Sequence, residues 1–181
     1  MRLFIAIPPG EAVEAELKRL TARLRPAAPD LRWSAPESWH ITLQFLGNTT
    51  EEQYACLLPR LSEVKAAPIA IGFEGLGVFE RAGVLLLGVA PSPALVALQK
   101  RVEAATQPCG LEPEDRPYRP HITLARSKSG NRGRELRALL ERAGESLRFE
   151  RFLATEFRLY ESHLSAGGSK YEVKCRFALG R

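Results

Sequence analysis

The tetrapeptide His40-Ile41-Thr42-Leu43 recurs as His121-Ile122-Thr123-Leu124, nearly half the length of the 181-residue chain further on. Each copy sits in a stretch typical of a β-strand, and a glycine-containing break and a stretch with helical spacing follow it. This repeated order predicts an internally duplicated α+β fold. We expect a bilobal molecule with pseudo-two-fold related antiparallel sheets and flanking helices around a central groove, forming one domain over residues 1–181.

The histidine and the threonine of each motif share one face of the predicted strand, because side chains alternate along a strand. The isoleucine and the leucine point to the opposite face and anchor the strand on a core. Two such motifs placed face to face supply two imidazoles and two hydroxyls. These groups can serve as base, acid and hydrogen-bond donors for attack at phosphorus.

A single histidine in a strand is more often structural than catalytic. Here, two of only three histidines occupy identical tetrapeptides, which indicates a shared function. The third, His163, lies outside any motif, and we expect it on the surface or in a loop.

Hydrophobic periodicity predicts the remaining elements. Helices are expected over residues 11–25, from Thr49 or Thr50 to about 66, from Ser92 or Pro93 to about 106, and over 135–143; Pro59 lies inside the second of these or ends it early. Strands are expected over residues 2–7, 31–34, 39–46, 68–79, 83–90, 121–126, 147–160 and 170–179. A loop is expected over Ser165–Ser169.

The composition is that of a globular protein, with 45% hydrophobic and 26% charged residues. The net charge is +5, and twenty of the twenty-six basic residues are arginine, whose planar fork suits phosphate. Mild basicity is common, so this charge alone does not establish an anionic partner.

The three cysteines, Cys56, Cys109 and Cys175, are widely spaced and form no Cys-x-x-Cys pair. This spacing favours reduced structural cysteines over a disulfide framework or a thiolate metal site. The apolar N-terminal stretch is too short for a signal peptide or an anchor, so we expect a cytoplasmic protein without membrane association.

The paired motifs resemble those of the RNA 2′,3′-cyclic phosphodiesterases, also called 2′-5′ RNA ligases, of the two-histidine phosphoesterase superfamily. The resemblance covers nearly the whole chain and is carried by Arg2–Ile7, His40–Gly47, Arg116–Arg126, Leu159–Ser162 and Tyr171. It implies hydrolysis of a terminal RNA 2′,3′-cyclic phosphate to a 2′-phosphate without a metal or other cofactor. It also implies weak, reversible 2′-5′ ligation. Expected partners are RNA ends or nucleotides with a 2′,3′-cyclic phosphate, bound by a monomer.

The resemblance further implies roles for individual residues. His121 matches the base that activates water, and His40 matches the acid that protonates the departing 3′ oxygen. The symmetry of the motifs leaves an exchange of these two roles open. Thr42 and Thr123 match the hydroxyls that bind the phosphate.

Arg126 matches an arginine that neutralises the phosphate, and Phe45 matches an aromatic that stacks on the terminal base. Strict strand alternation places both side chains on the face opposite the histidines. A bulge, a strand end or a long side chain would be needed to place Phe45 and Arg126 on the same face as the histidines.

Two other classes of function compete with this hypothesis. A metal site would need a third ligand, and neither motif provides one. A binding module for RNA ends or nucleotides would keep the groove without turnover, but the intact histidines and threonines of both motifs argue against it.

Overall fold

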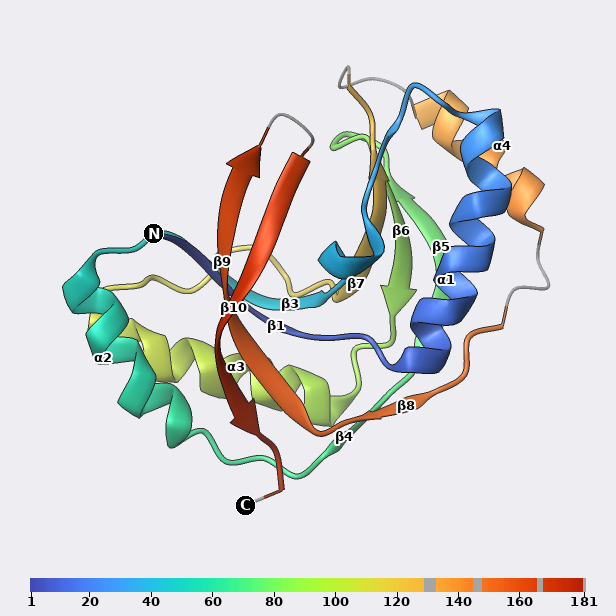
Figure 1. The fold of residues 1–181 in the computed structure, drawn as a ribbon. Coiled ribbons are helices and arrows are strands. Elements are labelled where there is room, and N and C mark those ends of the chain that lie inside the picture. Colours follow the sequence, from blue (N-terminus) through green and yellow to red (C-terminus); the bar gives the residue numbers. More distant parts are fainter. Residues whose placement is uncertain (129–132, 145–147, 166–167, 181) are drawn as a thin grey trace.

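Two four-stranded antiparallel sheets form the two lobes of the computed structural model, which describes residues 1–128, 133–144, 148–165 and 168–180 (Figure 1). The first sheet has the order β10-β9-β1-β3, with β1 (Arg2–Ile7), β3 (Ile41–Asn48), β9 (Glu156–Ser165) and β10 (Gly168–Ala178). The second has the order β2-β7-β6-β5, with β2 (Arg32–Trp33), β5 (Phe73–Phe79), β6 (Val84–Val89) and β7 (His121–Arg126). Each sheet therefore contains one of the repeated motifs.

Four helices flank the sheets. The helix α1 (Glu11–Leu24) packs against α4 (Gly133–Ala143), which contacts β5, and α2 (Glu51–Ser62) packs against α3 (Pro93–Thr106), which contacts β3. Each pair thus covers one lobe, as Figure 1 shows. The predicted bilobal α+β fold is confirmed. No described helix is long and apolar enough to cross a membrane.

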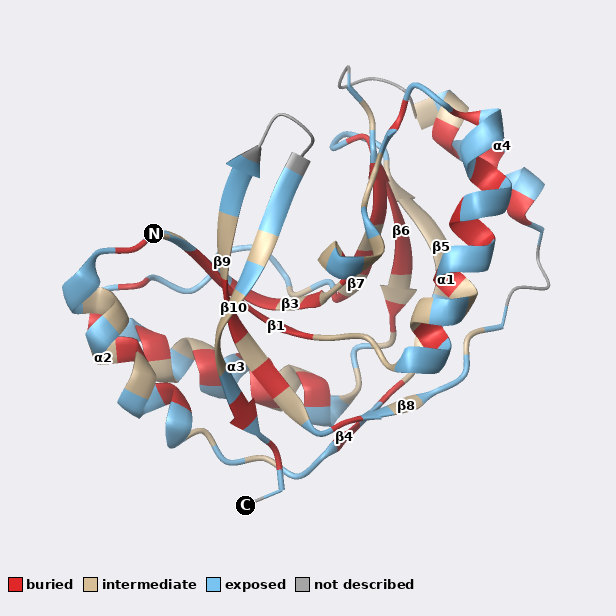
Figure 2. Cartoon of the chain, viewed as in Figure 1, coloured by how far each residue is buried: buried red, intermediate tan, exposed pale blue. Residues whose placement is uncertain are grey.

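One cluster of buried hydrophobic residues joins the two lobes (Figure 2). It includes Ile41 and Leu43 of β3, and Ile122 and Leu124 of β7, each at most 2% exposed. The apolar positions of both motifs therefore anchor their strands, as the alternation predicts. The opposite faces of the strands remain available for polar groups.

Local sequence signals explain where the helices begin. Thr50 and Gln53 form a capping box at the start of α2, and the Ser92 hydroxyl accepts a hydrogen bond from the Leu95 backbone N–H at the start of α3. Pro59 lies inside α2 and does not end it. The helix nevertheless ends at Ser62, before the expected residue 66.

Three expected segments differ from the structure. The stretch 68–79 is two strands: β4 (Ile69–Ile71) pairs with β8 (Phe152–Ala154), and β5 pairs with β6. The stretch 147–160 likewise divides into β8 and β9, and its first residue lies outside the described part. Of the expected loop Ser165–Ser169, Ser165 ends β9 and Gly168 begins β10, while residues 166–167 are not described. A strand that changes partners keeps its hydrophobic pattern, which explains why periodicity missed these divisions.

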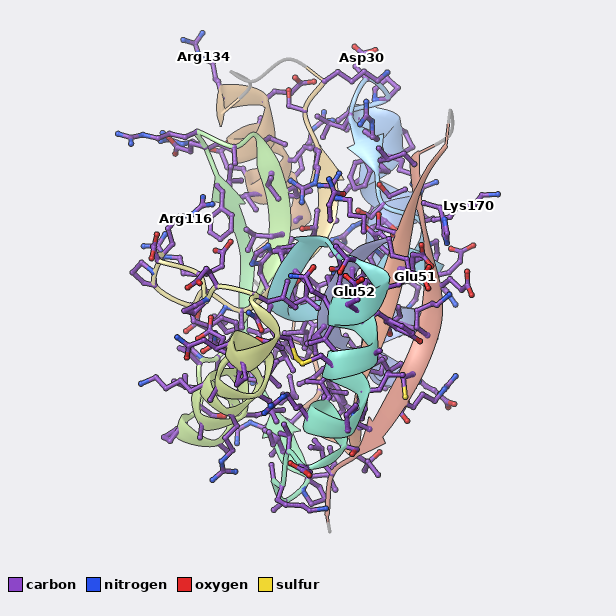
Figure 3. All side chains as sticks on the ribbon, turned by 90° about the vertical axis from the view of Figure 1, so that its left-hand side faces the viewer. Asp30, Glu51, Glu52, Arg116, Arg134 and Lys170 are labelled. Carbon is purple, nitrogen blue, oxygen red and sulfur yellow. A yellow bond between two sulfur atoms is a disulfide. The ribbon has the colours of Figure 1, made fainter. Side chains whose placement is uncertain are left out.

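The expectation of reduced cysteines is wrong for two of the three. Cys56 on α2 and Cys109 in the short 3₁₀ helix Gln107–Cys109 form a disulfide that closes a sequence separation of 53 residues (Figure 3). Cys175 is free. Sequence spacing alone does not show that α2 and this 3₁₀ helix pack side by side.

Candidate active site

Both motif histidines are held by the same backbone contact. His40 directly precedes β3, and its Nδ1 lies 2.7 Å from the carbonyl oxygen of Ser38. His121 is the first residue of β7, and its Nδ1 lies 2.7 Å from the carbonyl oxygen of Arg119. A carbonyl can only accept, so Nδ1 carries the hydrogen in both rings. Each neutral imidazole therefore has Nε2 as its acceptor.

Aromatic rings hold each imidazole from the side. The Phe4 ring on β1 lies 4.7 Å from the His40 ring, and Tyr171 on β10 meets it edge-on at 5.3 Å. The Phe79 ring on β5 lies 4.9 Å from the His121 ring. Each histidine is thus positioned by a backbone carbonyl and by a phenylalanine from another strand of its own sheet.

The surroundings lower the pKa of both histidines. The pKa of His40 is lowered to about 4. Burial is the largest cause, the hydrogen bond to Ser38 opposes it, and the charges of His121 and Arg126 act in the same direction as burial. Burial also lowers the pKa of His121, again with a contribution from Arg126. These couplings show that the structure brings His40, His121 and Arg126 together. Both imidazoles of the free protein are therefore mainly neutral at pH 7.

A β-bulge interrupts each motif strand at the same point. In β3, Thr42 pairs with Ala6 and Gln44 pairs with Ile5, so Leu43 is an extra residue. As a result Leu43 and Gln44 are buried in succession, and the alternation resumes one residue later.

The bulge in β7 has the same form. Thr123 pairs with Leu86 and Ala125 pairs with Leu85, so Leu124 is the extra residue. Leu124 and Ala125 are consecutive buried residues.

The two bulges reverse the expected placement of Phe45 and Arg126. Strict alternation puts these residues opposite the histidines, and that expectation is wrong because each bulge restores the side chain to the histidine face. Phe45 is 56% exposed, and Arg126 is exposed as well. They occupy equivalent positions, five residues after the histidine of their motif.

Thr42 and Thr123 are half-buried at the histidine face of their strands, as the alternation predicts. Thr42 also lines a cavity of about 680 Å³. His121 lies at this cavity too, together with side chains from β5, α3 and the segment that precedes β7. Its lining includes Phe45, Phe79, Glu80, Arg81, Gln99, Glu114, Arg116, Tyr118 and Arg119.

The segment 110–120, here called the approach segment, is fastened to β3 by two side chains. The Tyr118 hydroxyl donates to the Thr42 carbonyl oxygen at 3.0 Å, and the Gln44 amide donates to the Glu112 carbonyl oxygen at 3.4 Å. Burial raises the pKa of Tyr118, so the phenol keeps its proton. Arg116 projects outward from this segment (Figure 3).

Tyr118 and Gln44 thus hold the approach segment against β3, and neither is assigned a role by the sequence. The sequence shows a tyrosine three residues before His121, but it does not show that this tyrosine bonds to Thr42, which lies 76 residues away.

His163 lies on the surface, in β9, at a distance from the motif residues. Its Nε2 lies 3.2 Å from Glu172, and the Lys174 amine lies 3.1 Å from Glu161. Glu161, His163 and Glu172 place ligand atoms within 4.8 Å of one another. Lys174 already supplies a cation to both carboxylates, so this cluster is a cross-strand ion network.

Among the residues that the structure describes, no third imidazole, thiolate or carboxylate joins His40 and His121 in a group with ligand spacing. The charged neighbour of both is Arg126. A guanidinium repels a metal ion and attracts a phosphate, so the site has the electrostatics of an anion site.

The chain resembles known proteins over nearly its whole length. It is 33% identical to an RNA 2′,3′-cyclic phosphodiesterase of Archaeoglobus fulgidus, covering 95% of this chain and 97% of that protein. It is 32% identical to an RNA 2′,3′-cyclic phosphodiesterase of Bacillus subtilis, covering 97% of this chain and 95% of that protein.

Solved structures share the fold. The apo crystal structure of Escherichia coli LigT matches with a TM-score of 0.79 at 25% identity, covering 99% of this chain and 98% of that one. TT0787 of Thermus thermophilus matches with a TM-score of 0.74 at 28% identity, covering 98% and 97%. The model of the 2′-5′ RNA ligase superfamily matches residues 8–165, a range that contains both histidine motifs. With its paired motifs on two matching sheets, the chain belongs to the 2′-5′ RNA ligase superfamily.

Proposed function

We propose that the protein hydrolyses a terminal RNA 2′,3′-cyclic phosphate to a 2′-phosphate without a metal ion. The observation that carries this proposal is the pair of imidazoles, equally oriented on two facing strands and coupled to one arginine. The names of the relatives in Archaeoglobus fulgidus and Bacillus subtilis support this substrate class.

His121 is the proposed base. Its Nε2 takes a proton from a water molecule, whose oxygen then bonds to phosphorus while the bond from phosphorus to the 3′ oxygen breaks. His40 is the proposed acid and gives a proton from its Nε2 to that 3′ oxygen. The product carries a 2′-phosphate and a free 3′-hydroxyl. With the 5′-hydroxyl of a second RNA in place of water, the same steps give a 2′-5′ phosphodiester, and this ligation is reversible.

The low pKa of His40 sets a condition on this assignment. In the free protein a single proton prefers His121, whose pKa is lowered less. A bound phosphate brings a negative charge that offsets Arg126, and it therefore raises the pKa of both imidazoles. His40 acts as the acid once the phosphate has bound. With the roles exchanged, His40 would be the base and His121 the acid, and the pKa of His40 would not have to rise.

The remaining motif residues have supporting roles in the proposal. The Thr42 and Thr123 hydroxyls donate hydrogen bonds to the non-bridging phosphate oxygens, and Arg126 neutralises the charge that develops on them. Phe45, exposed at the cavity, stacks on the terminal base.

Two observations support chemistry without a metal. The described residues provide no third ligand for an ion held between the histidines, and the positive charge of Arg126 acts on both imidazoles. The proposal adds no cofactor, because each proton transfer is assigned to a side chain of the chain itself.

The test is an assay of nucleoside and oligonucleotide 2′,3′-cyclic phosphates in the presence of a chelator, with the product identified as the 2′- or 3′-phosphate. We expect full turnover and the 2′-phosphate. Complete loss with the chelator would favour a metal enzyme. Binding of the substrate without turnover would favour a binding module.

A further inference from the structure

One buried side chain of the cavity makes no hydrogen bond to the residues that the structure describes. Gln99 lies on α3 and is 6% exposed, yet it lines the cavity beside Thr42 and His121. Its helix neighbours Leu95, Leu98 and Val102 are fully buried hydrophobic residues that pack into the core. An amide on the inward face of this helix therefore needs an explanation.

No hydrogen bond joins the Gln99 amide to any residue in the described part of the chain, and its nitrogen and oxygen are not fully enclosed by protein atoms, so they reach the space of the cavity. The second buried glutamine near the site differs in this respect. The Gln44 amide accepts from the Thr106 hydroxyl at 2.8 Å and donates to the Glu112 carbonyl oxygen at 3.4 Å. Gln44 is thus a satisfied structural amide, whereas Gln99 keeps a donor and an acceptor for whatever fills the cavity.

The walls of the cavity suit a flat ring. Phe45, Phe79 and Tyr118 provide aromatic surface, and the volume of about 680 Å³ lies within the range of small-molecule sites. His121 and Thr42 mark the end at which the phosphate would lie. A nucleotide held there extends its base along the aromatic side chains towards α3.

We propose that Gln99 is a specificity-determining residue that reads the polar edge of the base attached to the reacting cyclic phosphate. This inference rests on the proposed function. The amide presents one donor and one acceptor side by side, so it matches a base edge that offers the complementary pair, as adenine does. A carboxylate at the same place has only acceptors and matches the two adjacent N–H donors of guanine.

The test compares the wild-type protein with Gln99→Met and Gln99→Glu. Substrates are the 2′,3′-cyclic phosphates of the four nucleosides and, as a reference without a base, methyl riboside 2′,3′-cyclic phosphate. In Gln99→Met, we expect kcat/KM for the preferred base, relative to the methyl riboside, to fall about three- to tenfold. In Gln99→Glu, the ranking should move towards guanine.

The control is Gln107→Met, an exposed glutamine outside the cavity, which should leave the ranking unchanged. A Gln99→Met protein that loses the same factor on every substrate, including the methyl riboside, would overturn the inference. An unchanged ranking in both Gln99 variants would overturn it as well. Thermal unfolding distinguishes a folding defect from a loss of base recognition. Methionine replaces an amide that makes no hydrogen bond to the described residues, so the substitution should not lower the melting temperature.

The inference and the proposed function can fail separately. If the wild-type protein hydrolyses none of these substrates, the proposed function fails, and calorimetric titration with the four nucleoside 3′-monophosphates becomes the test. Weaker binding by Gln99→Met that is confined to one or two bases would still support base reading. Equal affinities in both proteins would overturn it.

Discussion

The two motif strands share their backbone design and differ in their side chains. In both, a carbonyl two residues upstream holds Nδ1, a phenylalanine packs against the imidazole, and a bulge follows the threonine. The residue five positions after the histidine is Phe45 in β3 and Arg126 in β7. The shared features orient the imidazoles, and the unshared residues give the two strands different side chains at the same position.

The unequal surroundings also make the two histidines chemically different. His40 lies among Phe4, Tyr160 and Tyr171, whereas one aromatic ring, Phe79, contacts His121 in the described part of the chain. Heavier desolvation lowers the pKa of His40 further. A near-symmetric backbone therefore holds two imidazoles in unequal surroundings.

The largest expected effect tests whether the two halves act as one unit. His40→Ala and His121→Ala should each lower kcat about 10²- to 10⁴-fold, because each removes one proton transfer. The double variant should lose little more than either single variant. Steady-state kinetics with cytidine 2′,3′-cyclic phosphate measures this, with His163→Ala as the unaffected control. Full activity in either single variant would refute paired catalysis.

The next largest effect is the loss of kcat/KM when the equivalent residues Arg126 and Phe45 are replaced. Arg126→Ala should lower kcat/KM about 100-fold through lost charge stabilisation. Phe45→Ala should lower it about tenfold, mainly through KM, because one stacking contact is lost. Arg60→Ala, an exposed arginine on α2, is the control. Equal losses in Arg126→Ala and Arg60→Ala would show that the arginine contributes only general positive charge.

The pH dependence sharpens the difference between the histidines. Catalysis needs one neutral and one protonated imidazole, and that form predominates between their two pKa values. Both values lie below 6.5, so kcat/KM should peak below pH 6.5 and fall about tenfold per unit as the pH rises further. It should also fall below about pH 4, where both rings are protonated. A pH titration of kcat/KM would contradict this with a flat profile or a peak above pH 7.

The smallest expected effect concerns the hydrogen bond between the approach segment and β3. Tyr118→Phe removes the hydrogen bond to the Thr42 carbonyl oxygen and should raise KM about three- to tenfold with little change in kcat. Tyr54→Phe, on α2, is a control that leaves the approach segment intact. An unchanged KM would mean that the segment is held in place without this hydroxyl.

The sequence predicts the motif strands, the flanking helices and the two-lobed order because these depend on local periodicity. It misplaces Phe45 and Arg126 because a bulge is visible only in the pairing with β1 and β6. The Cys56–Cys109 disulfide, the Tyr118 contact and the place of Gln99 at the cavity depend on how distant segments pack. Local patterns contain no information about such contacts.

The matched bulges also bear on how such a chain can evolve. Regular pairing of the same residues, without the bulge at Leu43 or Leu124, would put the histidine and the residue five positions later on opposite faces of the strand. Surface loops tolerate a change of one residue in length, whereas such a change turns the later side chains of a strand to its other face. We expect the two segments from the histidine to the residue five positions later, 40–45 and 121–126, each to have been inherited without insertion or deletion after duplication of a half-length ancestor. Their last residues, Phe45 and Arg126, have diverged.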